Sequence, residues 1–152
     1  MVAKPNFQTT LLVRDSCLCL HVQRASRGLA RWFDDAFRPL GLTNGQFSLM
    51  MSLNRSEPPV MTQVATLLAM DQTTLTAALK PLRRRGLVKL TADPTDRRAR
   101  RMTLTSRGRR LLARAVPAWK TTHAAVEALL ADGDPDQFRR NLGAVSLLKG
   151  WE

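Results

Sequence analysis

The stretch "GLVKLTADPTDRRARRMTLTSRG", residues 86–108, alternates apolar and polar residues on both sides of a turn. "LVKLTA" at residues 87–92 and "ARRMTLT" at residues 99–105 show the period of two that is typical of short strands. "DPTDRR" between them has the composition of a turn, and Gly86 is a natural end for a preceding helix. The stretch therefore predicts a β-hairpin that follows a helix.

Before this hairpin, apolar residues recur at spacings of three and four, which is typical of amphipathic helices. Asp71 can cap a helix that runs to about Arg85, and Thr62 and Thr43 can cap two shorter helices before it. The residues of the last helix expected to face the core are Leu75, Leu79 and Leu82. Two helices, a recognition-type helix and a hairpin form a winged helix-turn-helix.

Long amphipathic helices are expected on both sides of this lobe, over residues 16–37, 106–131 and from about 135 onward. Their apolar stripes have no sheet or third layer against which to be buried in a single chain, so we expect a homodimer. The predicted fold is mainly α with a small β-hairpin wing. It is one domain, 1–152, with the winged helix-turn-helix at 41–105 and helical dimerisation regions at 1–40 and 106–152.

Positive charge is concentrated around the hairpin. The chain carries a net charge of +12, and residues 72–110 contain twelve basic residues against two acids. An ordinary solvated face is the alternative, but this density of arginine favours a polyanion, and double-stranded DNA is the expected partner. A membrane surface is disfavoured because no basic amphipathic helix with exposed Trp or Leu accompanies the patch.

No segment approaches the ~20 consecutive apolar residues that a membrane span needs. The two cysteines, Cys17 and Cys19, cannot build a disulfide framework, so a cytoplasmic location is expected. The chain has no tyrosine, no glycine-rich phosphate loop and no arrangement typical of a Ser/His/Asp triad. We therefore expect neither an enzyme nor a cofactor.

The exposed face of the recognition-type helix predicts contacts to bases. Gln can pair bidentately with adenine, Thr offers a methyl group for thymine, and Lys suits guanine or phosphate. The residues expected on this face are Gln72, Thr73, Thr74, Thr76 and Lys80. Residues expected to hold phosphates are Arg83, Arg84, Lys89, Arg100 and Arg101. At the hairpin tip, Arg97 and Arg98 can insert into a narrow minor groove, with Asp96 pairing bidentately to orient the Arg98 guanidinium.

These segments resemble the multiple-antibiotic-resistance regulator (MarR) family of bacterial and archaeal repressors. The resemblance lies in "PLGLTNGQFSLMMSL", "TTLTAALKPLRRRGLV" and "DPTDRRARRMTLTSRG" and covers about residues 17–130. The wing pattern matches at Asp96, Arg98, Ala99, Leu104, Thr105 and Gly108. The resemblance implies a homodimer with interlocked terminal helices on a pseudo-palindromic operator. It also implies Arg98 in the minor groove and, often, a small effector that changes the spacing of the two lobes.

The effector pocket implied by the resemblance lies between the first helix, the second helix and the dimerisation helices. The residues that this region offers are Cys19, His21, Gln23, Arg27, Phe33, Phe47, Met50 and Met51. This mostly apolar and aromatic set would suit a small aromatic or planar acid, with Arg27 available for a carboxylate. The alternative is that these are ordinary core residues of a protein without an effector.

A second alternative is a peroxide-sensing repressor, because Cys19 falls where the organic-hydroperoxide repressors of the family carry their reactive cysteine. Those repressors hold the thiolate with tyrosines, however, and Phe33 and Asn44 stand at the corresponding positions here. Cys17, Cys19 and His21 cannot converge on one metal ion, since Cys19 lies on another face of a helix than the other two. A third alternative is an architectural protein that binds DNA without sequence preference.

Overall fold

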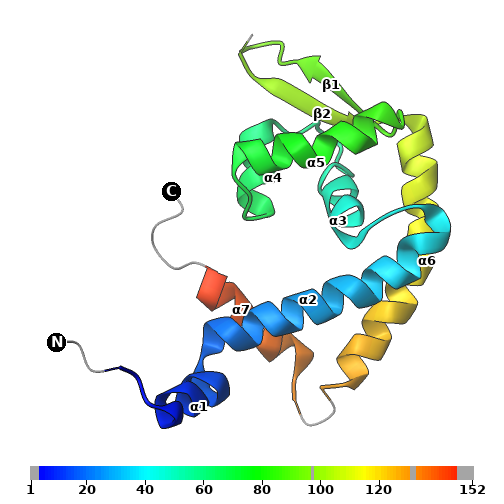
Figure 1. Cartoon of the computed structure of the whole chain (residues 1–152). Coiled ribbons are helices and arrows are strands. Elements are labelled where there is room, and N and C mark those ends of the chain that lie inside the picture. The colour runs from blue at the N-terminus through cyan, green and yellow to red at the C-terminus, as the bar shows by residue number, and fades with distance from the viewer. Residues whose placement is uncertain (1–3, 97, 131–132, 147–152) are drawn as a thin grey trace.

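The computed structural model describes residues 4–96, 98–130 and 133–146, which form a mainly helical chain with one β-hairpin (Figure 1). The elements are α1 (Phe7–Ser16), α2 (Leu18–Phe37), the 3-10 helix η1 (Arg38–Leu40), α3 (Asn44–Ser52), α4 (Met61–Leu67), α5 (Gln72–Arg84), β1 (Val88–Ala92), β2 (Arg100–Leu104), α6 (Ser106–Ala128) and α7 (Pro135–Ser146). The hairpin is antiparallel, with Val88 opposite Leu104 and Ala92 opposite Arg100. The predicted winged helix-turn-helix is confirmed.

Side-chain caps explain where the helices of the lobe begin. The Thr43 hydroxyl accepts a hydrogen bond from the Gln46 backbone N–H, and the Gln46 side chain accepts one from the Thr43 N–H, both at 3.2 Å. The Asp71 carboxylate accepts from the Thr74 N–H at 2.7 Å at the start of α5. These pairs supply acceptors for backbone donors that a helix leaves unsatisfied, so the expected starts of α3 and α5 are confirmed.

The expected cap of α4 was wrong. α4 begins at Met61 with Val60 as its N-terminal cap, so Thr62 lies inside the first turn. Val60 is held in an extended conformation by a β-bridge to Arg101 of the hairpin, and its N–H donates to the Gln63 side chain at 3.2 Å. The boundary therefore depends on a contact with a residue forty-one positions away as well as on the Gln63 side chain, and not on capping by Thr62.

The expected helix over residues 16–37 is interrupted at Cys17. Cys17 ends α1 and begins α2 with an extended ψ of 106°, and its sulfur accepts from the Leu20 N–H at 3.5 Å. Asn6 caps the additional helix α1 by accepting from the Thr9 N–H at 3.0 Å. Cys17 is therefore a corner residue between two helices.

The core lies where α3, α5 and the hairpin pack together and against α6. Leu75, Leu79 and Leu82 are buried as predicted, and they place the opposite face of α5 in solvent. Phe37 and Phe47 stack with ring centroids 4.6 Å apart, which joins α2 to α3. Figure 1 shows α2 crossing α6 at one side of the lobe, with the turn of the hairpin directed away from α6.

No helix within the described ranges is both long enough and apolar enough to cross a bilayer.

Candidate nucleic-acid interface

The outer face of α5 is polar and exposed. Gln72, Thr73, Thr74, Thr76 and Lys80 are all solvent-accessible, as the sequence predicted. The Thr74 hydroxyl donates to the Asp71 carboxylate at 2.8 Å, and the Thr76 hydroxyl donates to the Gln72 carbonyl at 2.7 Å. These two hydroxyls are thus engaged within the helix. The side chains of Gln72 and Thr73 make no hydrogen bond within the described part of the chain, so they have the greatest capacity to meet base edges.

A basic groove runs between the end of α5 and strand β1. It has a volume of about 630 Å³ and is lined by Lys80, Arg83, Arg84, Val88, Lys89 and Leu90. Four of these six side chains are cationic and none is acidic, a composition that suits phosphate groups. The structure brings together the recognition-helix and strand residues that the sequence predicted as phosphate contacts, while Arg100 is exposed on the neighbouring strand.

Arg55, beside α4, is a further candidate phosphate contact that the sequence prediction did not include. Arg55 and Gln63 line two cavities there, of about 490 and 290 Å³. In helix-turn-helix proteins the first helix of the motif crosses the DNA backbone, so this position suits a phosphate. The signal in the sequence was weak because Arg55 is an isolated basic residue in the loop after α3.

Asp93 organises the wing. Its buried carboxylate accepts hydrogen bonds from the Thr95 hydroxyl at 2.6 Å, the Thr95 N–H at 2.7 Å and the Asp96 N–H at 3.0 Å. The Arg101 guanidinium adds an ion pair at 2.5 Å. The Thr95 donors, followed by the Asp96 N–H and Arg101, hold the pKa of Asp93 well below its usual range. An aspartate side chain that accepts from the backbone N–H two residues later is a common turn motif. The sequence prediction considered only the charge of this segment and overlooked the motif.

The contacts expected for two charged residues of the wing were wrong. Arg101 was expected to hold phosphate, but it pairs with Asp93 and donates to the Pro58 carbonyl at 3.2 Å. Its guanidinium therefore joins the wing to the segment before α4. Asp96 was expected to pair with the Arg98 guanidinium, but it accepts from the Arg98 backbone N–H at 2.9 Å. It shapes the turn that carries Arg98, and Arg97 lies outside the described residues.

Replacing Asp93 with asparagine is expected to lower the melting temperature at pH 7, and to lower it by less at pH 3. A carboxylate whose pKa is lowered by folding contributes its full stability above the ordinary carboxyl pKa of about 4. This contribution is lost as the pH falls toward the lowered pKa that Asp93 has in the folded protein. Circular dichroism melts of both proteins at pH 7 and pH 3 measure the two differences. Equal differences at the two pH values would contradict the assigned role of the charge.

The residues expected to form an effector pocket are split into two groups. Cys19, His21, Gln23 and Arg27 are exposed along the first half of α2, whereas Phe33, Phe47 and Met50 are buried in the core and Met51 is exposed on α3. Cys19 and Phe33 are fourteen residues apart on one helix, which corresponds to about 21 Å. A single chain does not bring the two groups into one cavity, so the pocket stays a prediction.

The cysteines show hydrogen bonding but no metal centre. The Cys19 sulfur accepts from the Gln23 side-chain amide at 3.2 Å, and Gln23 in turn accepts from Arg27 at 3.3 Å. Residues 4–96, 98–130 and 133–146 contain no cluster of three or more potential metal ligands. Cys19 lies in the first turn of α2, as expected, and its redox role stays a prediction.

Comparisons with known proteins match this arrangement. A family model described as "MarR family" matches residues 40–99. The transcriptional regulator HosA of Escherichia coli O111:H- is 37% identical over 78 residues, which is 50% of this chain and 56% of that regulator. The chain thus aligns with just over half the length of this relative.

Solved structures extend the similarity over most of the chain. The M. tuberculosis transcriptional regulator MosR, crystallised in complex with DNA, is 38% identical with a TM-score of 0.79, covering 86% of this chain and 94% of that one. The transcriptional repressor CouR of Rhodococcus jostii RHA1, bound to a 23-mer DNA duplex, is 27% identical with a TM-score of 0.72. That match covers 95% of this chain and 97% of CouR.

Proposed function

Because this chain belongs to the MarR family of transcriptional regulators, we propose that it is a homodimeric repressor that binds a pseudo-palindromic DNA operator. The observation that carries the proposal is the exposed polar face of α5 beside a groove lined by four cationic side chains and no acid. The DNA complexes of MosR and CouR support the same use of the fold.

In the proposed complex, the N-terminal half of α5 enters the major groove. Gln72 and Thr73 contact base edges, while Lys80, Arg83 and Arg84 bind the phosphate backbone along the basic groove. Arg98 enters the adjacent minor groove from the wing. Phosphate contacts supply most of the affinity and base contacts supply sequence preference.

Selection of bound duplexes from a random DNA pool tests this proposal. A two-fold symmetric consensus is expected, and a fragment that contains it should compete at least ~10³-fold better than bulk DNA at physiological salt. A featureless pool with equal competition by bulk DNA would favour a non-specific architectural protein instead. The salt dependence of binding should be measured on the same fragment, because affinities for DNA have meaning only at a stated ionic strength.

The proposed dimer would bury the apolar side chains that the terminal helices expose. Leu18 is 72% exposed and Val22 is 39% exposed on α2, and α7 exposes Phe138, Leu142 and Val145. These side chains lie outside the winged helix-turn-helix, residues 41–105, which we call the reading lobe. Leu18 and Val22 are at the N-terminal end of α2, whose buried residues Phe33 and Phe37 lie at its other end, and α7 has no buried residue. Contiguous exposed apolar side chains of this kind are typical of protein–protein contacts.

Sedimentation equilibrium at micromolar concentration is expected to give twice the chain mass of 17.0 kDa. Replacing both Leu18 and Val22 with glutamate should shift the protein toward monomer, because two charges would be buried without partners. Leu67→Glu is the matched control, since Leu67 is 64% exposed on α4 within the reading lobe. A wild-type protein that sediments only as a monomer would contradict the dimer.

The proposed signal is a small aromatic or planar effector that changes the distance between the two lobes. Two recognition helices must lie about 34 Å apart to meet successive turns of the same DNA face. An effector that holds the lobes at another distance would therefore release the operator. Arg27, exposed on α2, is the side chain proposed to bind an effector carboxylate.

A further inference from the structure

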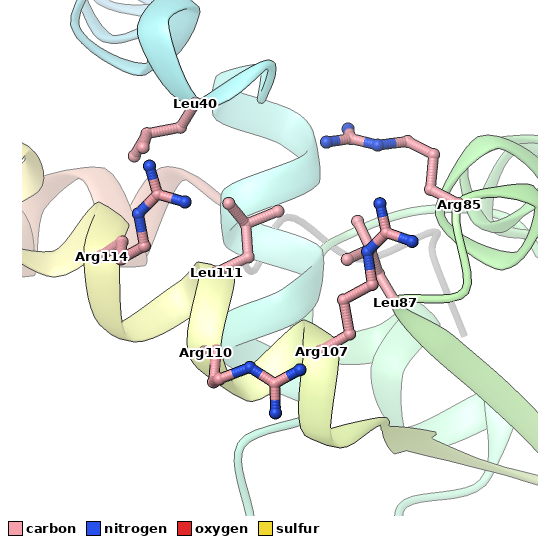
Figure 2. A pocket seen from close by; sticks show the side chains of 7 residues that line it. All are labelled: Leu40, Arg85, Leu87, Arg107, Arg110, Leu111 and Arg114. Atoms are coloured by element: carbon pink, nitrogen blue, oxygen red, sulfur yellow. The ribbon is translucent and has the colours of Figure 1, made fainter.

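Another cavity, apart from the basic groove and the two cavities beside α4, lies where the reading lobe joins α6. It has a volume of about 410 Å³ and is lined by Leu40, Arg85, Leu87, Arg107, Arg110, Leu111 and Arg114. We call it the arginine pocket. Figure 2 shows Arg107, Arg110, Leu111 and Arg114 on α6, with Arg85 extending toward them from the segment after α5 and Leu40 from η1. The spacing of residues 107, 110, 111 and 114 places them on one face of the helix.

The arginine pocket contains four positive charges and no acidic residue. Arg85 donates to the Gly41 carbonyl at 2.6 Å, which fixes its guanidinium at the edge of the cavity. Within the residues that the structure describes, Arg107, Arg110 and Arg114 form no ion pair. Like charges at helical spacings of three and four repel one another, so an anion that neutralises them would be bound favourably.

The shape and chemistry of the pocket define a class of ligand. Guanidinium groups match the geometry of phosphate oxygens and can donate two parallel hydrogen bonds to them. Leu87 is buried at the inner wall, and Leu40 and Leu111 add half-buried apolar surface. The volume lies within the range of about 300–1,000 Å³ that is typical of small-molecule sites. We propose that the arginine pocket binds a small phosphorylated ligand with an apolar body.

The pocket lies away from the parts of the lobe that are proposed to contact bases. Leu87 lies at the base of the hairpin, and the five residues from there to Ala92 place the wing turn about 17 Å away. Arg85 lies thirteen residues after Gln72, which corresponds to about 20 Å along α5. The pocket is therefore remote from both the wing tip and the base-reading end of α5.

Binding at this place would act on the orientation of the reading lobe. One wall comes from Arg85 and Leu87, in the short segment between α5 and β1 of the lobe. The others come from η1, which directly follows α2, and from α6. A ligand that contacts all of them holds the lobe at one angle to the α2 and α6 helices. This regulatory consequence rests on the proposed function, whereas binding of the ligand does not.

Titration with 1-naphthyl phosphate by calorimetry, in the absence of DNA, tests the proposal on the full chain. The wild-type protein is expected to bind it, and to bind it more weakly as ionic strength rises. The double variant Arg107→Gln/Arg114→Gln should lose at least about tenfold in affinity, because two charge-assisted contacts are removed. Arg31→Gln/Lys120→Gln is the charge-matched control, since both residues are exposed and lie outside the pocket. 1-Naphthol and inorganic phosphate, the two halves of the probe, should each bind more weakly than the intact ester.

Three results would overturn the proposal. The first is no binding of 1-naphthyl phosphate by the wild-type protein at millimolar concentration, and the second is equal affinity of the two double variants. The third is that Arg107→Gln/Arg114→Gln binds DNA more weakly and with a smaller salt dependence than wild type, while wild type does not bind the probe. That result would make the pocket a contact to the DNA backbone. The probe titration contains no DNA, so its failure is distinguishable from failure of the proposed function, which selection from the random pool tests.

Discussion

Replacing Gly108 with alanine is expected to lower the free energy of unfolding by about 3 kcal/mol. A Cβ at this position would lie 2.1 Å from the Leu87 carbonyl oxygen and 3.1 Å from its carbon. The carbonyl cannot move freely, because it accepts a hydrogen bond from the Thr105 N–H at 3.0 Å. The substitution therefore separates the start of α6 from the base of the hairpin.

The expected destabilisation is opposite to the usual effect, since replacing glycine with alanine within a helix usually stabilises a protein. Gly45→Ala is the matched control: Gly45 also lies in the first turn of a helix, and a Cβ there would meet no atom within 4 Å. That variant is expected to gain about 0.5 kcal/mol. Urea denaturation of the three proteins measures both changes. A Gly108→Ala protein as stable as wild type would refute the close approach of α6 to Leu87.

Arg98→Ala is expected to weaken binding to the selected operator by about 100-fold, because the proposed dimer would lose two minor-groove guanidiniums, each expected to contribute about 1–2 kcal/mol. Arg98 is exposed in the wing turn, and its backbone N–H is held by the Asp96 carboxylate at 2.9 Å. A narrow minor groove has an enhanced negative potential, which favours an inserted guanidinium. The expected loss depends on the side chain, since the turn itself is held by backbone contacts.

Fluorescence anisotropy with labelled operator at 0.15 M salt, about physiological ionic strength, measures the change. Arg98→Lys should recover part of the affinity, because it restores the charge without the planar donor group. Arg31→Ala, which removes an exposed arginine from α2, is the control for net charge and should bind within a few-fold of wild type. Equal affinity of Arg98→Ala and Arg31→Ala would remove Arg98 from the proposed interface.

Much of the reading lobe could be predicted because its signals are local. Thr43 and Asp71 cap helices through hydrogen bonds to residues three positions away, and Gly86 adopts a φ of +66° just after α5 ends. The inward face of α5 follows from helical spacing alone. These features depend on neighbouring residues in the chain, so they can be read without knowing the rest of the fold.

The features that sequence reasoning missed depend on distant residues. The start of α4 is set by the bridge between Val60 and Arg101, and Arg101 is engaged by Asp93 and Pro58 instead of being free for phosphate. Charge counting treats every arginine of a basic run alike. Only the register of the hairpin separates those that face solvent from those that hold the wing to the lobe.

The sequence by itself determined the winged helix-turn-helix, the polar face of α5 and the concentration of positive charge around the wing. Caps, turns and periodicity carry this information within about four residues. Only the tertiary structure decided that Arg85 lines one cavity with the arginines of α6 and that Asp93 anchors the wing. It also decided that the expected effector residues on α2 are separated from the core aromatics. The physical reason is that cavities, ion pairs and close backbone contacts arise from packing between segments far apart in the chain, for which one sequence contains no periodic signal.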